Sequence, residues 1–276
     1  MEHHRSTFLS KGHRVFSQRW QPETDPKGVL LIAHGLAEHS GRYAHLAEFF
    51  VAHNYAVCAL DHIGHGQSEG RQGFVNSFSD YTDTLDLFSA QVEQWYPGAP
   101  VFLVGHSMGG LISAHFLVSR QSRFQGSILS GAAIKPFDEP SALLLAVGRL
   151  LSRWLPTAGV MQLDADAISR DPQVVTAYRN DPLVYTGKIS ARLATEIFSA
   201  MTYVEENAHK IKLPMLLLHG SEDRLAASES SSFLDRTVTS VDKRLVIYQG
   251  LYHEIFNEPE QLQVMTNIVE WLDRRC

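Results

Sequence analysis

The fold of this chain is decided by the stretch Val101-Phe-Leu-Val-Gly105-His-Ser107-Met-Gly109-Gly-Leu-Ile-Ser-Ala-His-Phe-Leu-Val118. Residues 101–104 form a short apolar run, which is typical of a strand buried on both faces of a sheet. Residues 105–109 fit the pattern Gly-x-Ser-x-Gly, and the apolar segment after them predicts a helix. A strand, a sharp turn around a serine and a helix make a nucleophile elbow, which presents the serine at the top of a sheet. The stretch therefore predicts a strand–turn–helix unit with Ser107 at its turn.

A second stretch, Gly66-Gln-Ser68-Glu-Gly70, fits the same pattern, so the pattern alone does not identify a nucleophile. The residues before it, His62-Ile-Gly-His65, and those after it, Arg71-Gln-Gly73, are typical of loops. An elbow needs a strand on one side and a helix on the other. Ser107 is therefore the candidate nucleophile, and a strand–turn–helix unit that merely contains a serine stays open as the alternative.

Around the elbow, short apolar runs alternate with segments of helical periodicity. This alternation predicts an α/β fold with a mostly parallel sheet and helices on both faces. Residues 1–20 predict an antiparallel hairpin at the edge of the sheet. Strands are expected at residues 28–33, 55–60, 101–104, 127–129, 215–218 and 245–248, and helices at 79–95, 110–118 and 262–272.

The alternation is interrupted between residues 133 and 205, which we interpret as an inserted helical cap, or lid. Residues 1–132 and 206–276 would then form one core domain, whose size is usual for a single domain. Within the cap, residues 143–155 predict an amphipathic helix with one apolar face. That face either contacts a lipid surface or packs against the core; its residues are Leu143, Val147, Leu150 and Trp154.

The elbow architecture requires an acid and then a histidine after the serine along the chain. Among the histidines after Ser107, only His253 follows a strand later than the expected acid loop, so it is the candidate base. The loop after the strand at 215–218 reads His219-Gly-Ser-Glu222-Asp223. Asp223 is the favoured candidate acid, and Glu222 stays open as the alternative.

A serine hydrolase also needs backbone amides that bind the developing oxyanion. One should be the amide of Met108, the residue after the nucleophile. The other should come from the loop after the strand at 28–33, which reads His34-Gly-Leu36. We expect the amide of Leu36 to be this second donor.

Composition and charge exclude several classes of protein. The chain has 276 residues, 24 basic against 30 acidic side chains and a net charge of −6, so the basic footprint of a nucleic-acid binder is missing. Its two cysteines exclude a disulfide framework. We expect no signal peptide and no membrane-spanning helix, since no apolar stretch reaches about 18 residues. The expected location is the cytoplasm, with a peripheral position at the membrane left open.

A metal site has weak support. His62 and His65 follow Asp61, but two histidines fall short of a usual ligand set. His253-Glu254 lacks the second histidine of a zinc-protease motif, and the phosphate-loop pattern is absent. We therefore expect neither a metal nor a cofactor.

Several motifs together resemble the monoacylglycerol lipases of the α/β-hydrolase superfamily. They are His34-Gly-Leu-Ala-Glu-His-Ser-Gly-Arg-Tyr43, Asp61-His-Ile-Gly-His-Gly-Gln-Ser68, Gly105-His-Ser-Met-Gly-Gly110 and the loops of Asp223 and His253. The resemblance implies an eight-stranded sheet with a helical cap and no cofactor. It also implies that Glu38 and Arg42 bind or orient the glycerol end of the substrate, although their spacing fits a local helix pair equally well.

The expected function is that of a serine ester hydrolase, which cleaves monoacylglycerols to fatty acid and glycerol through an acyl-enzyme intermediate. The alternatives are a broader carboxylesterase or lysophospholipase and, in another class, a binding protein that has the hydrolase fold but no activity. The expected partner is a monoacylglycerol or a similar lipid ester, with transient contact between the cap and a membrane or micelle surface. The sequence leaves the oligomeric state open.

Overall fold

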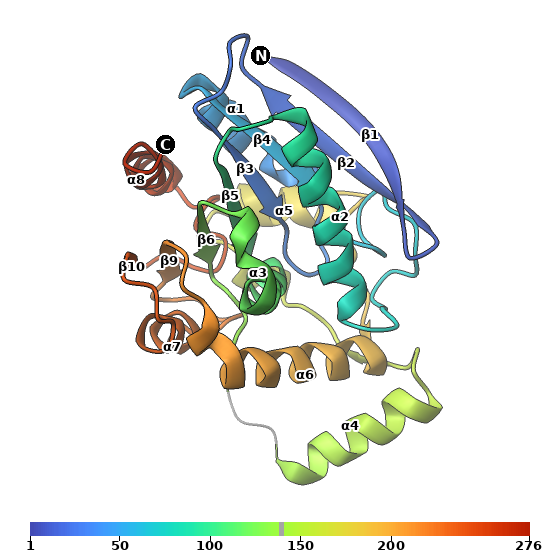
Figure 1. Cartoon of the computed structure of the whole chain (residues 1–276). Coiled ribbons are helices and arrows are strands. Elements are labelled where there is room, and N and C mark those ends of the chain that lie inside the picture. The colour runs from blue at the N-terminus through green and yellow to red at the C-terminus, as the bar shows by residue number, and fades with distance from the viewer. Residues whose placement is uncertain (138–140) are drawn as a thin grey trace.

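The computed structural model describes residues 1–137 and 141–276 and contains an eight-stranded sheet (Figure 1). The strand order in this sheet is β1-β2-β4-β3-β5-β6-β9-β10, and all neighbours from β4 to β10 run parallel. The expected α/β fold with a mostly parallel eight-stranded sheet is therefore confirmed. The strands are β1 (Glu2–Ser10), β2 (His13–Gln21), β3 (Gly28–Ala33), β4 (Tyr55–Leu60), β5 (Val101–His106), β6 (Gly126–Ser130), β9 (Met215–Gly220) and β10 (Lys243–Tyr248).

The predicted hairpin lies at the edge of the sheet. Strands β1 and β2 pair antiparallel from Glu2 opposite Gln21 to Ser10 opposite His13, and β2 continues antiparallel onto β4. The turn between β1 and β2 contains Lys11 and Gly12, both with positive φ. Two residues of this kind give a tight turn whose twist suits the flanking strands.

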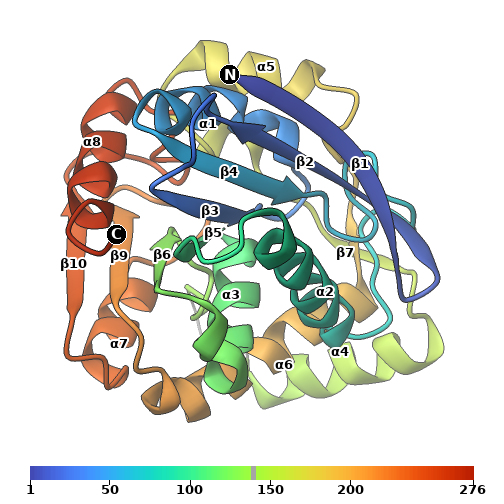
Figure 2. The ribbon, with the colours of Figure 1, turned by 45° about the horizontal axis from the view of Figure 1, so that its top comes forward.

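Helices cover both faces of the sheet (Figure 2). Side chains alternate along each parallel strand, so that Leu31 of β3 faces one apolar cluster and Leu30 faces the other. Helices α2 and α3 cover the first face, and α1 and α8 cover the second. The helices are α1 (Ala44–Ala52), α2 (Ser79–Trp95), α3 (Met108–Arg120), α4 (Ala142–Trp154), α5 (Pro172–Asn180), α6 (Ala191–Asn207), α7 (Glu229–Thr237) and α8 (Gln261–Leu272), with short 3-10 turns at Ser40–Tyr43, Gln121–Arg123, Ala165–Ala167 and Ala208–Lys210.

A largely helical insertion lies between β6 and β9. It contains α4, α5, α6 and the two short strands β7 (Gly159–Met161) and β8 (Ile189–Ser190). Residues of α6, among them Leu193 and Val204, belong to the same apolar cluster as α2 and α3. The limits 133 and 205 of the predicted cap remain an interpretation, and residues 138–140 within it lie outside the described part of the chain.

The apolar face of α4 does not pack against the core. Leu143, Leu150 and Trp154 are 74 %, 59 % and 70 % exposed. Helix α4 lies at the outer rim of the molecule, next to α6 (Figures 1 and 2). Of the two alternatives that the sequence leaves open for this face, packing against the core is therefore wrong. Across residues 1–137 and 141–276, none of the helices is long and apolar enough to cross a membrane.

The close approach of α3 to the end of β3 gives a test of the fold. A Cβ atom at Gly109 would lie 2.0 Å from the carbonyl oxygen of Ala33, which is backbone that cannot move aside, whereas one at Gly148 in α4 would meet nothing within 4 Å. Gly109→Ala should therefore lower the free energy of unfolding by at least about 2 kcal/mol through overpacking. Gly148→Ala should leave it unchanged or raise it by up to about 1 kcal/mol.

Denaturant titration of both variants measures this difference. Equal stability of Gly109→Ala and the unmodified protein would mean that α3 does not cross β3 as closely as described.

Candidate active site

Ser107 occupies the turn between β5 and α3 in a strained backbone conformation. Its φ and ψ are 54° and −119°, in a region that residues with a side chain rarely adopt. Its amide donates to the carbonyl of Ser130 at 3.0 Å, and its carbonyl accepts from the amide of Ala133 at 3.1 Å. These bonds to the last residue of β6 and to the segment that follows it hold the strained turn on both sides. The geometry is that of the nucleophile elbow which the sequence predicts.

His253 and Asp223 form a buried pair. They lie in the loops after β10 and β9, and Nδ1 of His253 donates to Oδ2 of Asp223 at 2.7 Å. The other carboxylate oxygen, Oδ1, accepts from the amides of Leu225 and Ala226 at 2.8 and 2.9 Å. Glu222 is exposed. Of the two acids that the sequence left open, the structure therefore brings Asp223 onto His253.

Burial and mutual attraction shift the pKa values of this pair in opposite directions. Burial works to raise the pKa of Asp223, but the charge of His253 and hydrogen bonds from His219 and His253 lower it well below its usual range. Burial works to lower the pKa of His253, but the charge and hydrogen bond of Asp223 outweigh burial and raise it. Asp223 therefore stays ionised, and a proton on His253 is stabilised.

A second histidine lies against His253. The ring of His106 is centred 4.7 Å from that of His253, and its Nδ1 donates to the carbonyl of Ser130 at 3.1 Å. Burial lowers the pKa of His106 to about 4. His106 is thus neutral at pH 7 and adds no positive charge beside His253.

Ser107 and His253 line one small cavity together with Gly35 and Leu36. A Cβ atom at Gly35 would lie only 3.1 Å from Cβ of Ser107, so the loop after β3 passes directly beside the elbow. Within the described residues, the amides of Leu36 and Met108 have no hydrogen-bond acceptor. Both expected oxyanion donors are therefore near the serine and unpaired.

Glu38 and Arg42 belong to a buried charged cluster at the same cavity. Nη1 of Arg42 lies 2.9 Å from Oε2 of Glu38, and the guanidinium forms two bonds of 2.6 and 2.7 Å to Glu254. Glu38 also accepts from the amide of Gly35 at 2.6 Å and from the hydroxyl of Tyr43 at 2.8 Å. Glu38 and Arg42 do pair, but Glu38 precedes the 3-10 turn Ser40–Tyr43, so they are not a pair on an α-helix surface.

The sequence reasoning missed Glu254. The only available signal was its position next to the candidate base, since its ion pair with Arg42 joins residues 212 positions apart. The charges of Arg42 lower the pKa of Glu254 against the opposing effect of burial. Glu254 is 5 % exposed, so this ion pair is part of the protein interior.

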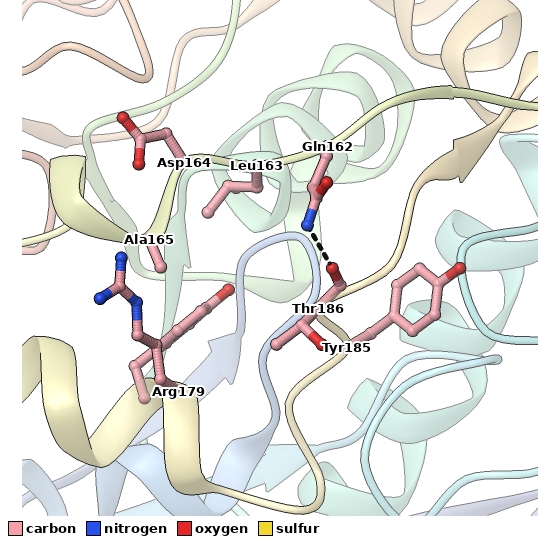
Figure 3. Close-up of a pocket in the computed structure, with 8 residues that line it drawn as sticks. Gln162, Leu163, Asp164, Ala165, Arg179, Tyr185 and Thr186 are labelled. Atoms are coloured by element: carbon pink, nitrogen blue, oxygen red, sulfur yellow. Dashed lines mark hydrogen bonds between the residues drawn. The ribbon is translucent and has the colours of Figure 1, made fainter.

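A larger pocket of about 410 Å³, whose lining Figure 3 shows, lies next to the cavity of Ser107 and His253. Leu163 and Tyr178 line both spaces and so form the boundary between them. On the cap side, Nε2 of Gln162 donates to the carbonyl of Thr186 at 2.7 Å, as Figure 3 shows. This pocket therefore lies on the cap side of that boundary, adjacent to the cavity of Ser107.

The second serine motif has a structural role. Oγ of Ser68 donates to the carbonyl of Asp61 at 2.6 Å and accepts from the amide of Phe16 at 2.9 Å. His62 and His65 also bond to backbone carbonyls, those of His34 and Ile63. Across the part of the chain that the structure describes, no group of three or more His, Cys, Asp or Glu side chains is placed to hold a metal ion.

Comparison with known proteins agrees with this geometry. A family model described as "Serine aminopeptidase, S33" (Hydrolase_4) matches residues 24–260. A monoacylglycerol lipase of Mycolicibacterium smegmatis is 39 % identical, over 95 % of this chain and 93 % of that protein. A monoglyceride lipase of Rattus norvegicus is 35 % identical, over 96 % and 88 %. The crystal structure of Paleococcus ferrophilus monoacylglycerol lipase is 32 % identical, covers both chains fully and superimposes with a TM-score of 0.83.

The fold and the comparisons define an α/β-hydrolase of the serine hydrolase class. The chain belongs to the family of that model, and it is similar over nearly its whole length to relatives named as monoacylglycerol lipases. These comparisons confirm the resemblance that the sequence motifs indicated. The chain is an enzyme of the carboxylic ester hydrolase type.

The buried charged cluster gives a test with a pH signature. Arg42→Met leaves Glu38 and Glu254 without their buried counter-charge, so the free energy of unfolding should fall by about 3–5 kcal/mol near pH 8. In the unmodified protein Arg42 lowers the pKa of Glu254. The ion pair therefore stabilises the fold at any pH above the ordinary glutamate pKa, and this stabilisation is lost only when the pH falls through the lowered pKa. In the variant the largest effect that lowers the pKa of Glu254 is gone, so burial shifts this pKa upward. The carboxylate then takes up a proton as pH falls, and the deficit should shrink between about pH 8 and about pH 5.

Denaturant titration at the two pH values measures the deficit. Arg149→Met is the matched control, because Arg149 is exposed on α4 and its loss should change stability by less than about 0.5 kcal/mol. A deficit for Arg42→Met that is the same at both pH values would contradict the electrostatic account.

Proposed function

We propose that this protein is a serine ester hydrolase that cleaves monoacylglycerols to fatty acid and glycerol, with Ser107, His253 and Asp223 as its catalytic triad. The observation that carries the proposal is the buried bond between Asp223 and His253, beside a serine held in an elbow turn. Relatives named as monoacylglycerol and monoglyceride lipases, which align over nearly the whole chain, support this substrate class.

The reaction follows from the positions of these groups. Oγ of Ser107 attacks the acyl carbonyl carbon while Nε2 of His253 takes its proton. Asp223 holds Nδ1–H of His253 and stabilises the imidazolium, and the amides of Leu36 and Met108 bind the oxyanion. His253 then gives its proton to the glycerol oxygen as the ester C–O bond breaks. Water, deprotonated by His253, attacks the acyl-enzyme and releases the fatty acid, and the proton returns to Ser107.

The two ends of the substrate fit different surroundings. Glu38, His106 and Glu254 line the cavity of Ser107, and Arg42 lies directly behind the two carboxylates, so the polar end of the substrate would meet this charged cluster. The space proposed for the acyl chain is a mostly apolar groove of about 460 Å³ between α4 and α6, whose described lining is separate from that of the Ser107 cavity. Val147, Leu151 and Phe198 are among its lining residues. The groove provides space for a hydrocarbon chain away from the charged cluster.

The two serine motifs supply a matched pair of variants. Ser107→Ala should abolish labelling by a fluorophosphonate and lower kcat on a monoacylglycerol by about 10⁶-fold, because no nucleophile is left. Ser68→Ala removes only hydrogen bonds to backbone and should keep both labelling and turnover. Activity-based labelling and measurement of released glycerol check both outcomes.

A substrate panel separates the proposal from its alternatives. It compares monoacylglycerols of several chain lengths with short water-soluble esters and lysophospholipids. Much faster cleavage of short esters would contradict the proposed substrate and indicate a carboxylesterase. Much faster cleavage of lysophospholipids would indicate a lysophospholipase. Labelling that persists in Ser107→Ala would overturn the triad itself, and ligand binding without turnover would indicate a binding protein.

The exposed face of α4 supports a second part of the proposal, contact with a membrane or micelle surface. Leu143, Leu150 and Trp154 lie on one exposed helix face, and the acyl groove opens beside it. A helix of this kind lies at a lipid surface with its apolar face among the acyl chains. Monoacylglycerols reside in such surfaces, so contact would bring the groove to its substrate.

Charges placed on this face should weaken binding to lipid. The double variant Leu150→Glu/Trp154→Glu should bind phosphatidylcholine vesicles at least about ten-fold less tightly, since two apolar side chains no longer enter the bilayer. Turnover of a short water-soluble ester should not change. Vesicle co-sedimentation with and without the substitutions measures the difference.

The matched control is Leu262→Glu, because Leu262 is 64 % exposed on α8, outside the cap. It should bind vesicles like the unmodified protein. Equal binding of the double variant and the control would remove α4 from any role at the lipid surface.

A further inference from the structure

His219 is a second fully buried histidine on the candidate catalytic acid. It lies at the end of β9, four residues before Asp223, and its side chain is 0 % exposed. Its Nε2 lies 3.0 Å from Oδ2 of Asp223, the same oxygen that accepts from His253, and 2.9 Å from the carbonyl oxygen of Ala226. On its other side, Nδ1 lies 2.8 Å from Oγ of Ser231.

These contacts determine the tautomer of His219. Nε2 faces two groups that only accept hydrogen bonds, a carboxylate oxygen and a backbone carbonyl, so Nε2 must carry a hydrogen. In the neutral ring Nδ1 is then an acceptor, and the hydroxyl of Ser231 donates to it. Ser231 lies in α7 and is itself fully buried, which fixes the position of this hydroxyl.

We propose that His219, with its tautomer fixed by Ser231, is a positioning residue for the catalytic acid and acts on the reaction through Asp223. This inference rests on the proposed function of the triad. Oδ1 of Asp223 is held by two backbone amides, and Oδ2 accepts from Nδ1 of His253, so the carboxylate cannot rotate about its terminal bond without breaking a bond on each side. Nε2 of His219, whose hydrogen bonds to the Ala226 carbonyl, lies 3.0 Å from the same Oδ2 and places its positive hydrogen beside it. His253 therefore meets its acceptor in one orientation.

His219 also shares the charge that acts on His253. The groups that face His253 are Asp223, with Glu254 and Glu38 further away and His106 against its ring. Among them Asp223 has the largest effect in raising the pKa of His253. Because Nε2–H of His219 partly neutralises Oδ2, its removal leaves the full carboxylate charge on His253. The protonated form of His253 would then persist to higher pH.

The experiment measures the pH dependence of fluorophosphonate labelling of the full chain. His219→Leu should lower the labelling rate constant at its plateau by about ten-fold, well short of the roughly 10⁴-fold loss that follows when the acid of a triad is replaced. The acid limb of the profile should move up by about half a pH unit, because His253 must lose its proton to act as a base. His219→Gln supplies an amide N–H toward Asp223. It should restore most of the labelling rate constant and return the acid limb most of the way to its original position.

Ser231→Ala provides a second, milder route to the same result. Without the hydroxyl, Nδ1 of His219 loses its donor, and the limb should move in the same direction by a smaller amount. Thr84→Val is the matched control: it removes a buried hydroxyl of α2 that bonds to Ser10 of β1 and contacts no residue of the candidate site. It should lower stability without moving the acid limb.

The outcomes separate the inference from the proposed function. If the unmodified protein neither labels nor hydrolyses a monoacylglycerol, the proposed function fails. If it does both, but His219→Leu and Ser231→Ala keep an unshifted acid limb, His219 only fills space and the inference is overturned. Protein concentrations corrected for the folded fraction, measured by circular dichroism, keep a loss of stability from imitating the effect.

Discussion

The backbone at Ser107 is the constraint on which the rest of the site depends. A residue with a side chain stays at the combination of φ 54° and ψ −119° only where its surroundings leave no alternative. Here the turn is held by two bonds, one to Ser130 at the end of β6 and one to Ala133 in the segment after it. Helix α3 can lie this close to β3 because Gly109 has no side chain. Because the same contacts bring the ends of β3, β5 and β6 together, the strain at one residue and the assembly of the site have a common cause.

The loop after β3 links the site to the cap. The carbonyl of Ala37 accepts from the amide of Tyr185 at 2.8 Å, and Nε2 of His39 donates to Asp181 at 2.9 Å. The guanidinium of Arg42 lies 4.7 Å from the ring centre of Tyr178. All three partners belong to α5 or the segment after it. The loop that supplies the Leu36 amide is therefore the same loop that holds this half of the cap, whereas α4 stands apart with its apolar face exposed.

The sequence predicted the parts of the site that local patterns and chain order determine. The strand–turn–helix pattern distinguishes Ser107 from Ser68, and the order serine, acid, histidine leaves His253 as the base. Whether Asp223 or Glu222 is the acid depends on which side chain the turn after β9 directs inward, which spacing cannot tell. Glu254 was not found as a site residue because its partner Arg42 lies 212 positions away. His219 was not found because the approach of its ring to Asp223 and Ser231 depends on how the turn after β9 folds back, which residue spacing does not show. The face of α4 was undecidable for a similar reason, since an amphipathic pattern is the same whether a protein core or a lipid surface covers it.

The charged cluster limits how selective the proposed enzyme can be for its alcohol. A site that binds hydroxyls by buried, unpaired groups rejects analogues without them by about 10⁴-fold, because those groups are then left unsatisfied. Here Glu254 is bonded to both outer nitrogens of Arg42, and Glu38 accepts from a guanidinium, an amide and a phenol. The cluster therefore keeps its hydrogen bonds without a ligand, and an ester that lacks free hydroxyls leaves little unsatisfied. In the proposed reaction, selectivity must then come mainly from shape, at the boundary that Leu163 and Tyr178 form beside the cavity of Ser107.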